Sequence, residues 1–140
     1  LTAYPGATVV RTARLFGATG ENFVTSLKIP ARRGRPIRAV EDERGSFTYA
    51  PDMAARLLEL LSAGCPSGIL HLVGAEAASP YEVAQAVVEL FASSSTVTPI
   101  AAADLERPAA RPADTSLLCT RQPPLRGFRD ALPDLFRLRK

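Results

Sequence analysis

Residues 9–17 read VVRTARLFG, a run that opens with β-branched residues, stops at a glycine and lies almost at the start of the chain. Apolar runs of this kind are typical of strands inside a parallel sheet, where a strand has a neighbour on both edges. Only eight residues precede the run, too few for a parallel neighbour and its crossover. We therefore expect a buried strand whose sheet partners are encoded outside these 140 residues.

Helix-like and strand-like segments alternate along the rest of the chain. Ser79, Pro80 and Glu82 have the spacing of a capping box, which marks the start of a helix. Helices are expected at residues 21–29, 51–64, 80–91 and 128–136, the first ended by Pro30 and the last interrupted by Pro133. Short strands are expected at residues 37–40, 68–73 and 97–100, and loops at residues 31–36, 41–50 and 104–116. This alternation predicts an α/β fold.

Net charge and hydropathy indicate which classes of binding partner the chain is not expected to have. The net charge of +3 is too small to indicate nucleic-acid binding, so no nucleic-acid partner is expected. No stretch approaches the ~20 apolar residues of a membrane span, so no membrane partner is expected either. Residues 107–140 carry a net charge of +5 and residues 1–106 carry −2. The basic segment could face an anionic ligand or form a solvated, arginine-rich surface.

The two cysteines, Cys65 and Cys119, lie far apart and match no metal-binding spacing. This usage predicts a reduced, cytoplasmic protein without a metal site. The first residues also lack the basic and long apolar regions of a signal peptide.

The glycine-rich segment FGATGENF, residues 16–23, follows the expected strand and resembles the turn of a dinucleotide site. In such a turn, glycines let the backbone approach the pyrophosphate of the cofactor. Phe23 stands where a third glycine would allow close helix packing, and Arg14 lies inside the expected strand. A plain strand-to-helix turn is the preferred interpretation, and a small stand-alone nucleotide-binding α/β protein remains an alternative.

Several ionisable residues are assigned structural roles. His71 lies in the strand-like GILHLVG without a matched Ser or Cys nucleophile, which favours a place in the core. Asp52 follows Pro51 at the start of a helix, where a negative charge favours the helix dipole. The acids at residues 41–43 are consecutive, so they cannot readily converge on one metal ion, and we expect a solvated loop partly balanced by Arg44.

The segment RPAARPADTSLL, residues 107–118, contains two Arg-Pro pairs. Proline restricts the residue before it, so Arg107 and Arg111 should be displayed on an extended backbone. Guanidinium groups match phosphate oxygens in a bidentate manner. The segment predicts a diphosphate contact, with a rigid linker as the alternative.

The order of these motifs resembles successive blocks of one family, the dTDP-4-dehydrorhamnose reductases and related sugar-nucleotide 4-ketoreductases within the extended short-chain dehydrogenases/reductases. The blocks are VVRTARLFG, ENFVTSL, VEDERGSFTYAPDMAARLLELL, GILHLVGAEAASPYEVAQAVVELF, VTPI and RPAARPADTSLL, with GFRDALPDLF similar to the closing helix. The resemblance implies the C-terminal part of a Rossmann-type fold. Residues 1–20 would be a late Rossmann strand and turn, and residues 21–140 a small substrate-binding lobe with elements that return to the sheet.

The resemblance also implies a function. The chain would be the sugar-nucleotide-binding portion of an NADPH-dependent enzyme that reduces a dTDP-4-keto-6-deoxyhexose in deoxysugar biosynthesis. The expected partners are a dTDP-sugar, a missing N-terminal Rossmann half or partner chain, and a second copy in a homodimer. A non-catalytic binding or regulatory subunit with the same fold is the alternative.

The family's catalytic Tyr-x-x-x-Lys pair and its glycine-rich cofactor loop do not occur in these residues. Tyr4, Tyr49 and Tyr81 are followed four residues later by Thr8, Met53 and Gln85. In the family the tyrosine protonates the reduced carbonyl oxygen and the lysine lowers the pKa of the tyrosine. No catalytic residue is therefore assigned here, and NADPH is expected to bind only the intact enzyme.

The resemblance implies a set of substrate-binding residues near the sugar-nucleotide cleft: Arg14, Asn22, Phe23, Thr48, Tyr49, Arg111 and Ser116. Arg111 is expected to bind phosphate. Arg14 is expected near the sugar, at the carboxyl end of its strand, where open α/β sheets bind ligands. Arg14 stands where the family often carries an aromatic residue.

Overall fold

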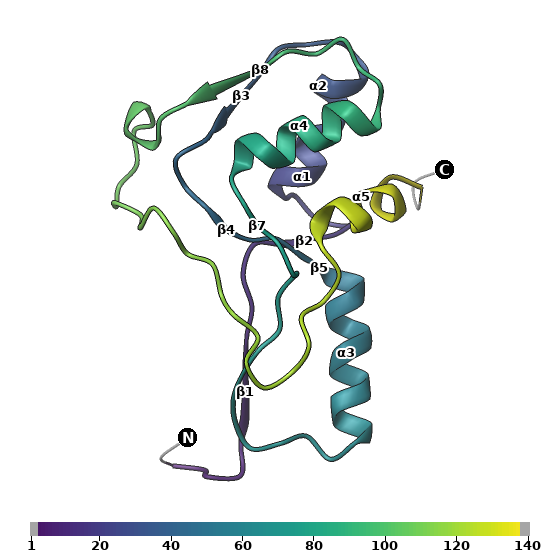
Figure 1. Cartoon of the computed structure of the whole chain (residues 1–140), viewed down its shortest axis with the longest axis vertical. Coiled ribbons are helices and arrows are strands. Elements are labelled where there is room, and N and C mark those ends of the chain that lie inside the picture. Colours follow the sequence, from purple (N-terminus) through teal and green to yellow (C-terminus); the bar gives the residue numbers. More distant parts are fainter. Residues whose placement is uncertain (1–2, 138–140) are drawn as a thin grey trace.

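The computed structural model describes residues 3–137, which form an upper and a lower part along the long axis of the molecule (Figure 1). The lower part holds strand β1 and the long helix α3, and the upper part holds most of the other helices and strands. Three of the four strand pairs are parallel. Helices pack against parallel strand pairs in both parts, so the predicted α/β class is confirmed.

The run at residues 9–17 forms two strands, β1 (Thr8–Arg11) and β2 (Leu15–Phe16), instead of one. The break lies at Arg14, whose φ of 40° falls in the left-handed region and cannot continue a strand. β1 pairs in parallel with β6 (Gly68–His71), and β2 pairs in parallel with β5 (Thr48–Tyr49). Each has one neighbouring strand among the described residues, so the expectation that its sheet partners lie outside these 140 residues is wrong for one edge.

The expected burial of the first strand is wrong for one of its faces. Val9 and Ile69 lie opposite each other in the β1–β6 pair, and they are 40% and 38% exposed. No described helix or strand fully covers this face. The apolar residues are therefore present, but the second packed layer that they predict is not found among the described residues. The other face packs well: Val10 and Leu70 contact the apolar side of α3.

Helix α3 (Ala50–Ser62) begins close to Pro51 and ends before Gly64, as expected. Proline is favoured in the first turn because no intrahelical amide bond is lost there. Gly64 has φ of 77°, the left-handed conformation that terminates many helices. Leu57 and Leu60 turn toward the sheet and form the small core of the lower part.

The upper part is built on the parallel pair β3 (Ile37–Val40) and β8 (Val97–Ile100). Helix α4 (Pro80–Leu90) crosses this pair, and α5 (Phe128–Arg137) packs against α4 (Figure 1). The predicted capping box is present: the Ser79 hydroxyl accepts from the Glu82 amide at 3.1 Å, and the Glu82 carboxylate accepts from the Ser79 amide at 2.7 Å. The shared core contains Phe16, Val24, Leu27, Phe47, Val83, Val87, Leu132 and Leu135.

Three local predictions are wrong. The helix expected at residues 21–29 is two short helices, α1 (Phe23–Ser26) and α2 (Lys28–Arg32), and Pro30 lies in the first turn of the second, where proline is tolerated. Pro133 does not interrupt α5. The loop expected at residues 41–50 contains β4 (Gly45–Ser46) and β5, and β4 pairs with β7 (Ala77–Ala78) in antiparallel fashion.

The two parts of the molecule meet at Gly74. A Cβ atom at this position would lie 2.3 Å from the Phe47 carbonyl oxygen and 3.3 Å from that of Arg126. The Gly74 amide donates to the Thr48 hydroxyl at 3.4 Å. Three passes of backbone therefore cross here with no space for a side chain. After the crossing the chain enters α4, and a 3-10 turn, η1 (Ala102–Asp104), follows β8.

Candidate functional site

A cavity of about 580 Å³ opens in the upper part between β2, α1, β3, β8 and residues 105–111. Four arginines line it, and two glutamates balance part of their charge. These six residues are Arg14, Arg38, Arg107, Arg111, Glu21 and Glu43. The rest of the lining is mainly apolar and includes Phe23, Phe47 and Leu105. A concave apolar site with a few convergent charges is a usual ligand-binding arrangement.

Arg14 reaches the cavity from the break between β1 and β2. Its guanidinium lies over the Phe47 ring, 5.2 Å from the ring centre, and donates to the Arg44 carbonyl at 3.2 Å. Partial burial lowers the pKa of Arg14; Glu43 raises it, and the like charges of Arg111 and Arg107 lower it. The ionised form of Arg14 is therefore less favourable than in water, and an anion in the cavity would stabilise it.

Glu43 is buried, with 5% of its surface exposed, and its carboxylate forms an ion pair with Arg107. The expectation of a solvated acidic loop is wrong for this residue. Its neighbour Asp42 is exposed and accepts from the Ala102 amide at 2.8 Å. Because Glu43 neutralises Arg107, the arginine charges left for an anionic ligand are those of Arg14, Arg38 and Arg111.

Residues 107–117, here called the Arg-Pro arm, are attached to the fold on both sides of Arg111. Arg107 is held by Glu43 at one end. At the other end, the Arg44 amide donates to the Ala113 carbonyl at 2.7 Å and the Thr115 amide donates to the Arg44 carbonyl at 3.0 Å. Within the described part of the chain, the Arg111 side chain makes no hydrogen bond or ion pair. Arg111 is therefore displayed at the cavity without a partner of its own.

Four of the seven residues expected at the cleft line this cavity: Arg14, Asn22, Phe23 and Arg111. Asn22 also caps α1, since its side-chain oxygen accepts from the Thr25 amide at 3.0 Å. The cavity lining does not include Thr48, Tyr49 or Ser116. Thr48 is fully buried at the Gly74 crossing, and the Ser116 amide donates to Asp114 at 2.8 Å within the arm.

Sequence reasoning missed Arg38, Glu43 and Phe47 as lining residues. Arg38 had a signal, because it is the exposed charged residue within the apolar strand β3. Glu43 and Phe47 had none, because their neighbours in space come from residues 107 and 14.

Tyr49 faces a second, smaller cavity of about 320 Å³ with Asp52, Arg126 and Asp134. Arg126 pairs with Asp52 at 2.6 Å and with Asp134 at 2.7 Å, and its guanidinium lies 5.4 Å from the centre of the Tyr49 ring. Burial raises the pKa of Tyr49, and its hydroxyl has no hydrogen-bond partner among the described residues. Asp52, in the first turn of α3, is therefore linked through Arg126 to Asp134 of α5.

The remaining candidates give no further site. The His71 ring lies 3.0 Å from the Leu118 carbonyl and is partly exposed. Residues 3–137 contain no group of three His, Cys, Asp or Glu side chains placed to hold a metal ion. The helix that follows the glycine-rich segment has only four residues, as in a plain strand-to-helix turn. No helix in the described range combines the length and apolar character needed to cross a bilayer.

The family model described as the RmlD substrate binding domain matches residues 1–136. A probable dTDP-4,6-dihydroxy-2-methyloxan-3-one 4-ketoreductase of Streptomyces antibioticus is 40% identical over 97% of this chain and 48% of its own length. A dTDP-4-dehydrorhamnose reductase of Mycolicibacterium smegmatis is 38% identical over 96% of this chain and 43% of its own length. The chain thus spans about half the length of these relatives.

Solved structures agree with the fold. A dTDP-4-dehydrorhamnose reductase from Bacillus anthracis, in complex with NADP, superimposes with a TM-score of 0.85 at 23% identity, over 94% of this chain and 48% of that one. A reductase of the same name from Clostridium acetobutylicum gives a TM-score of 0.83 at 26% identity over the same shares.

Proposed function

Because the chain belongs to the family of RmlD substrate-binding domains, we propose that it is the sugar-nucleotide-binding portion of a reductase that acts on a dTDP-4-keto-6-deoxyhexose in deoxysugar biosynthesis. One observation carries the proposal: the cavity that holds Arg14 and Arg111 in a mainly apolar lining. A nucleoside-diphosphate sugar has the matching pattern, since its charged diphosphate lies between a base and a sugar.

The charges of the cavity fit a diphosphate. Arg111 has no partner among the described residues, and Arg14 bonds to a backbone carbonyl only, so neither is matched by a carboxylate of its own. Each phosphate of a diphosphate diester carries one negative charge. Guanidinium groups bind such oxygens in short, charge-assisted hydrogen bonds. The proposed role of Arg111 is to hold the phosphates. Arg14 is proposed to bind where the second phosphate joins the sugar, so that it contacts that phosphate as well as the adjoining end of the sugar.

The apolar rim fits the other parts of the ligand. Leu15, Phe23 and Leu105 line the cavity and are each more than a third exposed. Phe23 lies beside Phe47, with ring centres 6.4 Å apart, and offers an aromatic surface for a base or a sugar face. These residues would position the ligand and exclude water from it. Asn22 is proposed to contact it from the start of α1.

The chain's own residues do not fit NADPH. The helix after the glycine-rich segment is one turn long, and Phe23 occupies the place of the third glycine. We therefore propose that NADPH, which would supply the hydride, is held by another part of the intact reductase. That part would continue the sheet at the uncovered edge of β1. Residues 1–20 and 21–140 would then be a late Rossmann strand and a substrate lobe with returning elements.

Two further parts of the proposal concern location and assembly. Both cysteines are free thiols, as in proteins of the reducing cytoplasm, which is the location that we propose. A homodimer of the intact reductase is proposed as well, and sedimentation of that protein would test it.

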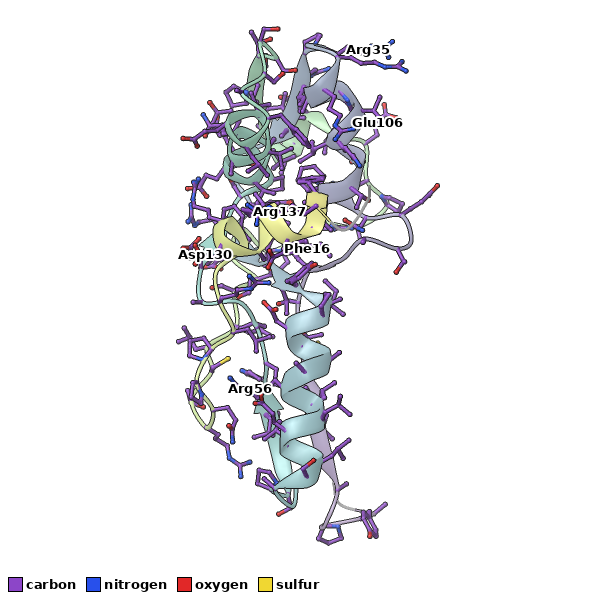
Figure 2. The ribbon with its side chains drawn as sticks, turned by 90° about the vertical axis from the view of Figure 1, so that its right-hand side faces the viewer. Phe16, Arg35, Arg56, Glu106, Asp130 and Arg137 are labelled. Atoms are coloured by element: carbon purple, nitrogen blue, oxygen red, sulfur yellow. The ribbon has the colours of Figure 1, made fainter. Side chains whose placement is uncertain are left out.

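Calorimetry of the purified chain with dTDP and, separately, with NADPH tests the proposal. We expect weak binding of dTDP and no binding of NADPH. Arg111→Ala should weaken dTDP binding about tenfold or more, because it removes charge-assisted hydrogen bonds. Arg35→Ala is the matched control: Arg35 lies at the far end of the upper part, is exposed and does not line the cavity (Figure 2). Equal dTDP affinity of the Arg111 variant and the control, or binding of NADPH to the chain, would contradict the proposal.

A further inference from the structure

Arg14 is held in a conformation that costs free energy. Its φ of 40° is a left-handed conformation that side chains other than glycine rarely adopt. Its guanidinium is partly buried and faces the like charges of Arg107 and Arg111. Strained residues of this kind persist where the surrounding structure determines them, and they gather at binding sites. The neighbours of the Arg14 side chain determine where its guanidinium lies.

One close neighbour is Gly45, in the buried strand β4. A Cβ atom built on Gly45 would lie 2.4 Å from Arg14 Nε and 2.9 Å from Arg14 Cζ. It would also lie 2.8 Å from the Thr115 hydroxyl. Real Cβ atoms essentially never approach other atoms so closely, so any side chain at residue 45 would displace the guanidinium. The Arg14 head group occupies the space that glycine leaves.

Two contacts align the guanidinium once it lies in that space. The Phe47 ring, two residues along from Gly45, lies under the guanidinium, with 5.2 Å between Arg14 Cζ and the ring centre. The Arg44 carbonyl, one residue before Gly45, accepts from Arg14 Nη2 at 3.2 Å, and the same carbonyl accepts from the Thr115 hydroxyl at 3.0 Å. Residues 44–47 thus provide the space, the support and the acceptor for Arg14.

We propose that Gly45 is a positioning residue for ligand binding: its missing side chain directs the Arg14 guanidinium into the cavity. This inference rests on the proposed function, because Arg14 is taken to bind the sugar nucleotide. Gly45 itself touches no ligand and acts only through Arg14.

A double-mutant cycle with dTDP as the probe tests the proposal. Gly45→Ala should weaken dTDP binding at least about fivefold, by moving a charged hydrogen-bond donor out of place. In the R14A background the same substitution should change the affinity by less than about twofold, because contacting residues that act as a unit are not additive. The T115A background, which removes the other close contact, should leave the Gly45→Ala effect intact. Gly6→Ala is the control, since a Cβ there would meet only the Tyr4 ring at 3.6 Å.

A second measurement follows the Arg14 side chain without any ligand. The Arg14 Nε–H resonance should carry a ring-current shift from Phe47, identified by its loss in Phe47→Leu, and Gly45→Ala should abolish that shift. An unmoved resonance, or an equal loss of affinity in the R14A background, would overturn the proposal. If R14A binds dTDP as well as the unaltered chain while Gly45→Ala still moves the resonance, the proposed ligand role of Arg14 fails and the link from Gly45 to Arg14 stands.

Discussion

At the scale of single residues, the cavity depends on one buried carboxylate. Glu43 lies between the core and the cavity and holds Arg107 at the base of the Arg-Pro arm. The Glu43 side chain is nearly inaccessible, whereas that of Arg107 is 23% exposed. A buried charge that loses its partner is costly, so the pair fixes the start of the arm.

Glu43→Gln should lower the free energy of unfolding by about 1–3 kcal/mol, because the amide keeps a hydrogen bond to Arg107 and loses the charge. Urea denaturation measures this change. Glu106→Gln is the matched control: Glu106 is exposed and adjacent to Arg107 (Figure 2), and its replacement should cost less than about 0.5 kcal/mol. Equal stability of the two variants would contradict a buried ion pair.

The same residues show what the sequence could predict of the site. Arg111 lines the cavity, and the sequence carries a local signal for this, because the proline after it restricts the backbone. Glu43 has no such signal, because nothing within residues 41–43 distinguishes the acid that turns inward, and its partner lies 64 residues away. Tyr49 is expected at the cleft, but it lines the second, smaller cavity beside Arg126, again a residue distant in sequence.

At the scale of elements, the start of α4 connects to the cavity wall. Glu82 caps the helix through the Ser79 amide, and its carboxylate also pairs with Arg44 at 2.9 Å. Arg44 in turn donates to the Ala77 carbonyl at 2.7 Å and provides the carbonyl that holds Arg14. Glu82, which the sequence identifies only as part of a helix cap, therefore also belongs to a series of polar contacts that ends at Arg14 in the cavity.

This contact makes stability depend on pH. Partial burial raises the pKa of Glu82, but hydrogen bonds from Ser79 and Arg44 outweigh it, so the pKa of Glu82 is lowered in the folded chain. A lowered pKa stabilises the fold at pH above the ordinary glutamate value of about 4.3, and this stabilisation is lost as pH falls through the folded value. We expect Glu82→Gln to reduce the loss of melting temperature between about pH 5 and pH 3. The control Glu89→Gln should leave the slope unchanged.

Elements with a long or capped pattern could be predicted, and short ones could not. Helices α3 and α4 follow apolar spacing with a proline in the first turn, and α4 also has a side-chain cap. The two-residue strands β4, β5 and β7 are too short to show an alternation, and only their partners define them. The break at Arg14 has no local signal either, because arginine does not favour the positive φ that it adopts there.

At the scale of the whole molecule, the lower part has an uncovered side. β1 has one neighbouring strand among the described residues, and Val9 and Ile69 remain exposed beside it. Leu58 and Leu61 of α3 are also largely exposed, at 65% and 67%. Such apolar surface is typical of an interface. The Rossmann portion of an intact reductase is the proposed cover.

We expect the purified chain to be catalytically silent, because these residues contain no Tyr-x-x-x-Lys pair to protonate the reduced carbonyl oxygen. NADPH absorbance, followed with a dTDP-4-keto-6-deoxyhexose as substrate, should stay constant. The full-length Mycolicibacterium smegmatis reductase serves as the active control. Substrate-dependent loss of NADPH with the purified chain alone would contradict the expectation.

Gly74 limits how this molecule can vary. Two other backbone segments, at Phe47 and Arg126, lie against it, and unlike side chains they cannot rotate aside to admit even a methyl group. In a library that randomises this codon, we expect only glycine to survive a selection for folded protein, with or without nucleotide in the medium. Selection at residue 74 would thus report on folding alone. Residues around the cavity could change, and their selection would depend on the ligand.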